Sequence, residues 1–295
     1  MVEKKSISTS IFVICNYTFL LSMAILCLIP LIHTLAISFS SNVAVVSSQV
    51  ILWPVDFTLD SYDYVLKNNQ FTQSLLITMK RVALGIIINM FLTMLIAYPL
   101  SKEAKSFKWR TVYAWVFVFT MLFSGGLIPV YMVVRATGLL DSIWALILPG
   151  AVPVFNVVLL LNFFRGLPKE LEEAAFIDGA GHWVTLWKVY VPLSVPALVT
   201  VGLFVIVGHW NSWFDGIIYM NSSENYPLQS YLRTVVVERS MSSISFSDIQ
   251  KEVGRINDRT LKAAQIFLAA LPILILYPFL QKYFMKGIVL GSVKG

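Results

Sequence analysis

The chain has 295 residues, of which 57% are hydrophobic and 13% are charged, and its formal net charge is +6. Soluble domains carry about 25% charged residues, so this composition, with a mean hydropathy of +0.76, excludes an ordinary soluble protein. The net charge does not indicate nucleic-acid binding, because the basic residues gather in loops between apolar runs. Cys15 and Cys27 lie inside one apolar run and are interpreted as small hydrophobic residues rather than a disulfide or metal pair. The sequence therefore predicts an all-α polytopic membrane protein.

The first apolar run, residues 11–39, follows a short polar N-terminus of residues 1–10. Basic residues precede it, which is also typical of a secretory signal peptide. The run is longer than a signal core and no small-residue cleavage site follows it, so we interpret it as an uncleaved first span. Residues 40–70 then predict an outer loop with a short helix, in which Asp60 would be the N-cap.

The second apolar run, residues 71–100, is interrupted by Lys80 and Arg81. Either the helix continues beyond the bilayer on the outer side, or both charges face a water-filled cavity. We favour the first arrangement, because a charge inside a membrane is costly and a cation near a helix end can extend toward water.

Four further apolar runs predict the remaining spans, so that six spans form one domain over residues 11–285. Prolines inside these runs predict kinks, because a proline frees a carbonyl group that a neighbour must satisfy. The polar segment 221–262 is predicted to be an outer loop with an amphipathic piece near 231–237, and residues 286–295 form a basic tail. The four runs are residues 111–136, 143–164, 195–219 and 263–284.

The distribution of Lys and Arg predicts the orientation of the six spans. The short outer loops hold only Lys67 and Arg135, whereas the other side holds a large basic set. By the positive-inside rule, we expect both termini and the loop of residues 165–192 in the cytoplasm. The basic set is Lys4, Lys5, Lys102, Lys105, Lys108, Arg110, Arg165, Lys169, Lys188, Lys282, Lys286 and Lys294.

The loop of residues 165–192 is a polar stretch between two long apolar runs. Pro168 suits the first position of a helix, and the glutamates that follow it complement the positive helix end. Gly179 and Gly181 then predict a sharp turn, and a second short helix is expected over residues 183–190. On composition alone, this predicted hairpin is equally well explained as a solvated loop.

The spacing within this loop resembles a known motif. Glu173-Ala174-Ala175 is followed by three residues, Gly179, nine residues and then Val189-x-Val191-Pro192. The EAA loop of ABC importer permeases has the same spacing, and this chain differs only in having valine at the two branched apolar positions. In that family, the loop is a coupling helix that binds in a cleft of a cytoplasmic ATPase subunit.

The resemblance extends over nearly the whole chain. Residues 123–129, 208–214 and 286–295 are similar to the carbohydrate-importer branch, and within it to the second, maltose-type permease subunit of the oligosaccharide and polysaccharide-fragment group. The resemblance implies six transmembrane helices of the type I importer kind with a cytoplasmic coupling-helix hairpin. It also implies that the chain is not an enzyme and binds no cofactor, because ATP and magnesium would be bound by partner subunits.

The same resemblance implies a set of partners in a cell membrane. They are a second permease subunit, two cytoplasmic ATPase subunits and an extracytoplasmic sugar-binding protein, with lipid around the spans and no nucleic acid. The tail either reaches the ATPases or acts as a basic anchor at the membrane edge. Glu173 is the preferred docking contact. The full set of implied coupling residues is Glu170, Glu173, Ala174, Ala175, Asp178, Gly179 and Pro192.

The end of the fifth span combines hydrogen-bonding groups with indole rings, a combination that suits sugars. On a continuous helix, His209 and Trp213 share one face, and so do Asn211 and Asp215. The alternative is an aromatic belt with satisfied polar packing contacts. The predicted substrate-path residues are His209, Trp210, Asn211, Trp213, Asp215 and Asn156.

Other chemistry finds little support in the sequence. No GxxxxGK[ST] phosphate loop occurs, so the chain is not expected to bind ATP itself. The three histidines are isolated from one another, and neither a metal site nor a catalytic centre is predicted. Two alternatives remain: an ion-coupled secondary transporter, with Asp215 as the coupling acid, and a structural or sensory membrane protein.

Overall fold

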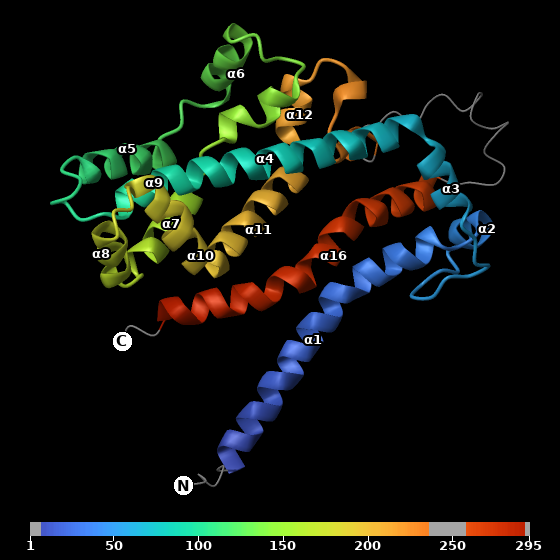
Figure 1. The fold of residues 1–295 in the computed structure, drawn as a ribbon. Helices are drawn as coiled ribbons and strands as arrows, with labels where there is room; N and C mark the ends of the chain where they lie inside the picture. Colours follow the sequence, from blue (N-terminus) through green and yellow to red (C-terminus); the bar gives the residue numbers. More distant parts are fainter. Residues whose placement is uncertain (1–6, 236–257, 293–295) are drawn as a thin grey trace. The chain divides into compact units, whose positions relative to one another are not determined.

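The computed structural model describes residues 7–235 and 258–292, and this part of the chain is helical without any strand. Three helices contain stretches that are long and apolar enough to cross a membrane, namely α1 (Ile7–Ser38), α4 (Asn69–Ser101) and α16 (Asp258–Ser292) (Figure 1). Three bent pairs of shorter helices raise the number of candidate spans in the described residues to six. The predicted all-α class is therefore confirmed for the described residues. The upper count equals the predicted number of spans, but the third bent pair runs over residues 182–211, with a bend of 85°, rather than over the predicted 195–219.

The chain divides into two compact units, and the first comprises residues 1–69 and 235–270. In it, α1 exposes large apolar side chains such as Phe12 and Tyr17 along its length, as a helix covered by lipid or by another protein would. A small core of Ala36, Ala44, Val45 and Val50 joins the end of α1 to α2 (Asn42–Val46).

The short helix predicted in the first outer loop is α3 (Asp60–Lys67). Asp60 was expected to be its N-cap, but the N-cap is Leu59, and the Thr58 hydroxyl accepts a hydrogen bond from the N–H of Asp60 at 3.2 Å. Asp60 instead stands in the first turn, where a carboxylate still complements the helix dipole.

The second unit comprises residues 70–234 and 271–295, and several of its predicted spans are broken. The run 111–136 consists of α5 (Arg110–Leu122) and α6 (Leu127–Ala136), bent by 111°. Gly126 before α6 has φ = 87°, a conformation that favours glycine. Because α5 is about 20 Å long, it falls short of the hydrocarbon thickness of about 30 Å, so a full crossing needs the residues beyond it.

The run 143–164 is broken as well. It comprises the 3-10 turns η1 (Ile143–Leu146) and η2 (Leu148–Gly150) and then α7 (Val154–Arg165), with a bend of 49°. Pro153 lies at this break as the N-cap of α7, and since proline has no backbone N–H, a helix boundary suits it.

The fifth predicted span, 195–219, forms two helices. α11 (Val195–Asn211) ends at Ser212, which has an extended backbone, and α12 (Phe214–Tyr219) follows. The prediction that His209 shares a helical face with Trp213, and Asn211 with Asp215, is therefore wrong, because the helix does not continue through residue 212.

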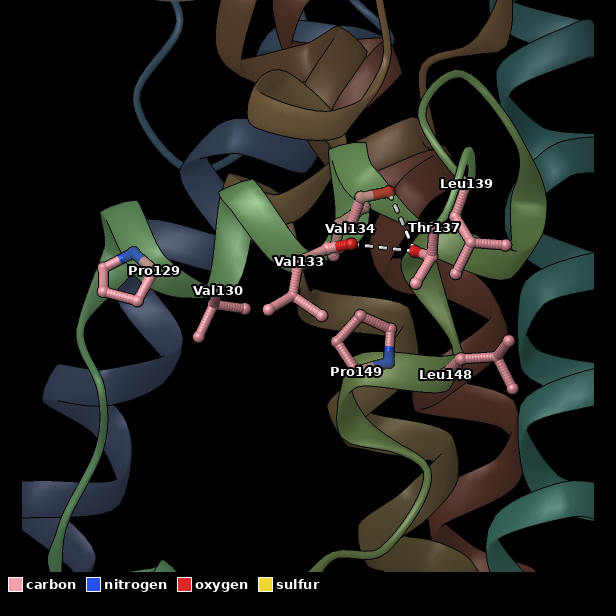
Figure 2. A pocket seen from close by; sticks show the side chains of 8 residues that line it. All are labelled: Pro129, Val130, Val133, Val134, Thr137, Leu139, Leu148 and Pro149. Carbon is pink, nitrogen blue, oxygen red and sulfur yellow. Dashed lines mark hydrogen bonds between the residues drawn. The ribbon is translucent and has the colours of Figure 1, made fainter.

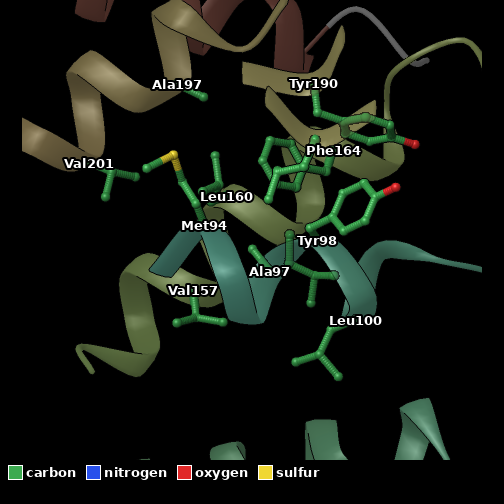
Figure 3. Close-up of a cluster of buried hydrophobic side chains, with 12 residues drawn as sticks. Met94, Ala97, Tyr98, Leu100, Val157, Leu160, Phe164, Tyr190, Ala197 and Val201 are labelled. Carbon is green, nitrogen blue, oxygen red and sulfur yellow. The ribbon is translucent and has the colours of Figure 1, made fainter. Parts of the chain in front are cut away.

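The core of the second unit lies where α4, α7 and α11 meet the end of the polar loop. Buried apolar side chains from these segments form one cluster, in which Tyr98, Phe164 and Tyr190 lie together (Figure 3). The ring of Tyr190 stands edge-on to those of Tyr98 and Phe164, with centroids 5.0 Å and 5.3 Å away. This packing fixes the C-terminal end of α4, which the positive-inside rule predicts to be cytoplasmic, against the loop.

The remaining outer segment is only partly described. η4 (Ser223–Asn225) and α13 (Leu228–Arg233) lie in it, and α13 begins three residues before the predicted amphipathic piece at 231–237. Most of the predicted loop 221–262 falls outside the described residues, as do the last three residues of the predicted tail. α16 continues as helix through the first part of that tail.

Candidate functional site

The polar loop is helical on both sides of a turn at Gly179, and we call these residues, 165–192, the hairpin. Its first helix is α8 (Lys169–Ile177), preceded by Pro168 as N-cap rather than as the first helical residue. Asp178 is the C-cap, and Gly179 has φ = 81°, a left-handed conformation that closes the turn and favours glycine. The chain then returns through α9 (His182–Thr185), the π-helix η3 (Leu186–Tyr190) and α10 (Val191–Leu193), which contains Pro192.

One face of α8 is open. The acidic residues Glu170 and Glu173 are exposed beside the small Ala174. Leu171 and Ile177 are 42% and 85% exposed, which is unusual for such side chains in a polar loop. An exposed surface that combines small, apolar and acidic side chains is suited to close contact with another protein.

The other face of α8 is attached to the chain's own core through Glu172. Its Oε1 accepts a hydrogen bond from Nζ of Lys102 (2.6 Å), and its Oε2 accepts one from the Tyr190 hydroxyl (2.6 Å). Lys102 is the residue directly after α4, and only 7% of its side chain is exposed. Neither Lys102 nor Glu172 was predicted as a site residue, because nothing in the sequence pairs residues 70 positions apart.

A second polar cluster surrounds Arg81, in the middle of α4. Nη1 and Nη2 of this guanidinium form an ion pair with the carboxylate of Asp215 in α12. Nη1 also donates to the carbonyl oxygen of Ser212 at 3.4 Å, and Nη2 to that of Leu146 at 3.2 Å. Arg81 thus binds the backbone at the break between α11 and α12 and the backbone of η1.

His209 completes this cluster on the α11 side. Its Nδ1 accepts from Nε of Arg81 at 3.3 Å, and its Nε2 lies 3.2 Å from Nδ2 of Asn89. The ring packs so closely against α4 that a Cβ added at Gly85 would lie 2.4 Å from Nε2. The glycine therefore permits the contact between the two helices.

Lys80 and Arg81, the two neighbouring cations of the second span, have different environments. Lys80 is exposed, whereas Arg81 is 2% exposed and bound to protein groups. Both arrangements considered from the sequence treated the two charges alike, whereas protein groups enclose Arg81 and leave Lys80 exposed. The available signal was the combination of a cation in one apolar run and Asp215 at the end of another, since charges within membranes are usually paired.

The predicted substrate-path residues fall into three groups. His209 and Asp215 come together at Arg81. Trp210 and Asn156 are buried, at 5% exposure each. Asn211 and Trp213 are exposed, and the guanidinium of Arg233, also exposed, lies 4.9 Å from the centre of the Trp213 ring. Arg233 was missed because it lies in a different element, as the last residue of α13.

A hollow next to α6 does not share this polar character. Figure 2 shows its eight lining residues, of which only Thr137 is polar. The Thr137 hydroxyl donates to the carbonyl oxygens of Val133 and Val134, so it is not directed at a ligand. The hollow suits an apolar side chain of a neighbouring helix better than a sugar.

The candidate spans indicate a membrane protein, and comparison with known proteins shows its family. The family model for the binding-protein-dependent transport system inner membrane component matches residues 6–290. The chain therefore belongs to this family and is a multi-pass membrane permease component of an ABC importer.

Individual relatives make the assignment more specific. The polygalacturonan/rhamnogalacturonan transport system permease protein YtcP of Bacillus subtilis is 43% identical over 95% of this chain and 96% of its own length. Protein LplC of the same organism is 40% identical over 97% of this chain and 95% of its own. A solved chain of a bacterial ABC transporter involved in the import of the acidic polysaccharide alginate is 33% identical, with a TM-score of 0.89, covering 96% of this chain and 100% of that one. These matches confirm the predicted family and fold class.

Proposed function

We propose that the chain is one of two permease subunits of an ATP-driven importer of oligosaccharides, and that α8 binds a cytoplasmic ATPase subunit. ATP and magnesium are bound by that partner, both termini lie in the cytoplasm, and an extracytoplasmic sugar-binding protein delivers the cargo. The observation that carries the proposal is the open face of α8, which presents Glu173 and Ala174 within the EAA spacing. The dependence of the family on a binding protein supports the delivery step.

The ion-coupled alternative finds less support. It depends on Asp215 as an acid that takes up and releases a coupling ion. Asp215 instead accepts hydrogen bonds from Arg81, from the Ser212 hydroxyl at 2.9 Å and from the Gly216 N–H at 2.9 Å. These contacts occupy the carboxylate in holding α12 to α4, which leaves the ion-coupled alternative without a free acidic group at this position.

The cargo we propose is a fragment of an acidic polysaccharide. The names of two similar proteins mention polysaccharides of this kind, alginate and polygalacturonan. In this chain, the exposed pair of Trp213 and Arg233 offers an aromatic surface beside a cation. A uronate residue suits such a pair, because its ring C–H groups contact an aromatic surface and its carboxylate pairs with a guanidinium.

The coupling contact is tested by co-purification from detergent-solubilised membranes. We expect the ATPase subunit to co-purify with the wild-type chain and to be lost from the variant Glu173→Ala/Gly179→Leu. Gly179→Leu places a side chain at a positive φ and Glu173→Ala removes the preferred contact. If no ATPase accompanies either form under conditions that preserve membrane complexes, the proposal fails.

The cargo is tested by uptake into proteoliposomes that hold the complete complex. We expect an oligogalacturonate to be imported and a neutral maltodextrin of equal length to be imported more slowly. Arg233→Gln removes the cation that faces Trp213, and we expect it to reduce uptake of the acidic sugar by about tenfold, as the loss of one charge-assisted contact does. Equal effects on both sugars would contradict the assignment of Arg233 to the uronate.

A further inference from the structure

Lys102 occupies an unusual position for a charged side chain in a loop. Its ammonium group lies 3.8 Å from the centre of the Tyr98 ring and 4.1 Å from that of Tyr190, and it forms an ion pair with Glu172. Burial lowers the pKa of Lys102, and the Glu172 carboxylate opposes this shift by stabilising the charged form. The lysine is thus enclosed by two aromatic faces and one carboxylate.

The partners of Lys102 come from three segments of the second unit. Tyr98 is in the last turns of α4, Glu172 is in the middle of α8, and Tyr190 ends the π-helix η3. The two tyrosines lie side by side, with their hydroxyl groups toward the same edge of the buried core (Figure 3). The cluster therefore joins the hairpin to a membrane-spanning helix at one point.

Such a cluster resists separation. Moving α8 away from α4 would leave a lysine or a glutamate without its partner in a mostly buried place, which is far more costly than separating exposed charges. It would also remove the cation from two ring faces, each of which attracts it. Displacement of α8 is thereby passed to α4 rather than absorbed within the loop.

We propose that Lys102 and Glu172 are positioning residues that transmit movement of α8 to α4 and η3, and so couple ATP hydrolysis to transport. This inference rests on the proposed function, in which α8 is the segment that an ATPase moves. It assigns to Glu172, which directly precedes the EAA residues, an inward role distinct from the docking role of Glu173.

The chain itself supplies a matched control. A second ion pair, between Lys169 and Glu103, links the same two segments one residue further along, but its side chains are 69% and 55% exposed. Water screens that pair, so its removal should not alter how α8 and α4 move together. The two pairs differ mainly in burial and in the two tyrosine rings.

The experiment uses the complete complex, with partner permease, ATPases and cargo-loaded binding protein, in proteoliposomes. It measures the amount of assembled complex, the stimulated ATPase rate and the uptake of oligogalacturonate per ATP hydrolysed. For Lys102→Met, we expect assembly to be retained while uptake per ATP falls about tenfold, within the range usual for coupling between two sites. We expect Lys169→Met to leave all three quantities unchanged.

A second variant tests the same cluster in case Lys102→Met does not fold. Tyr190→Phe keeps the ring in the core and removes only the hydroxyl that donates to Glu172. We expect it to assemble normally and to lower uptake per ATP by a smaller factor than Lys102→Met does.

The outcomes separate this inference from the function on which it rests. A wild-type complex without ATP-dependent uptake would overturn the proposed function. Normal wild-type transport with unchanged uptake per ATP in both Lys102→Met and Tyr190→Phe would overturn the positioning role alone. A fall in uptake and ATPase rate in step with lost assembly in both variants would show a purely structural role and would also overturn it.

Discussion

Two ion pairs of the second unit can be compared. Arg81, within α4, pairs with Asp215, and Lys102, directly after α4, pairs with Glu172. The two pairs hold different parts of the chain together. Arg81 also donates to two backbone carbonyl groups, at Leu146 and Ser212. Lys102 instead sits against two tyrosine rings and has a single carboxylate partner. The first pair fixes a break in a helix, and the second joins two helices through side chains.

The difference follows from the chemistry of the two cations. A guanidinium is planar, carries five N–H donors and can serve a carboxylate and several carbonyl groups at once. An ammonium group is compact and makes favourable contacts with aromatic faces from many directions. Arginine therefore suits the irregular backbone near Ser212, at the break between α11 and α12, and lysine suits a contact between two helices that is lined by aromatic rings.

The largest effect is expected at Arg81. Arg81→Met leaves the carboxylate of Asp215 without its cation and removes the donor that the carbonyl oxygens of Ser212 and Leu146 share. Removing one partner of a buried pair costs about 3–5 kcal/mol, so we expect a loss of this order in the free energy of unfolding, measured in detergent by thermal or denaturant unfolding.

The neighbouring lysine is the control for that change. Lys80 is exposed on the same helix, and Lys80→Met should leave the free energy of unfolding within about 0.5 kcal/mol of wild type. Arg81→Lys should recover only part of the loss, because an ammonium group cannot reach the carboxylate and both carbonyl groups together. Full recovery by lysine would contradict the role of the planar guanidinium.

An intermediate effect is expected at Gly85, which faces His209 of the same cluster. Gly85→Ala places a Cβ 2.4 Å from Nε2 of the imidazole, so the ring or the helix must shift. Overpacking of this kind costs about 1–3 kcal/mol. In Gly208→Ala, the new Cβ meets no atom within 4 Å, so this variant should unfold at the same temperature as wild type or above it.

The smallest effect is expected at the exposed pair of Glu103 and Lys169. The hydrogen bond from Lys169 lowers the pKa of Glu103. The Glu103–Lys169 pair therefore stabilises the folded state at a pH above the pKa that Glu103 has in the unfolded chain. This stabilisation is lost as the pH falls through the lower pKa of Glu103 in the folded chain. Because both side chains are more than half exposed, we expect Glu103→Gln to change the midpoint of acid unfolding very little, and 1 M salt to remove any difference. A large shift would show that exposure does not explain the contrast with Lys102.

Local features of the sequence predicted much of the hairpin. Pro168 and Gly179 bound the observed helix α8 within one or two residues, because the lack of an N–H and tolerance of positive φ act on the backbone where they occur. The same local reasoning failed over residues 195–219, since no proline or glycine marks the break at Ser212. That break is stabilised from α4, by Arg81.

The sequence by itself determined the class of protein and the family. Apolar runs of membrane-spanning length, the alternation of basic loops and the EAA spacing are all properties of consecutive residues, which the chain carries before it folds. Only the tertiary structure decided which charges meet, since Arg81 and Asp215 are 134 positions apart and Lys102 and Glu172 are 70 apart. The physical reason is that a buried charge takes its partner from whatever element packs against it, and that packing depends on the whole set of helices.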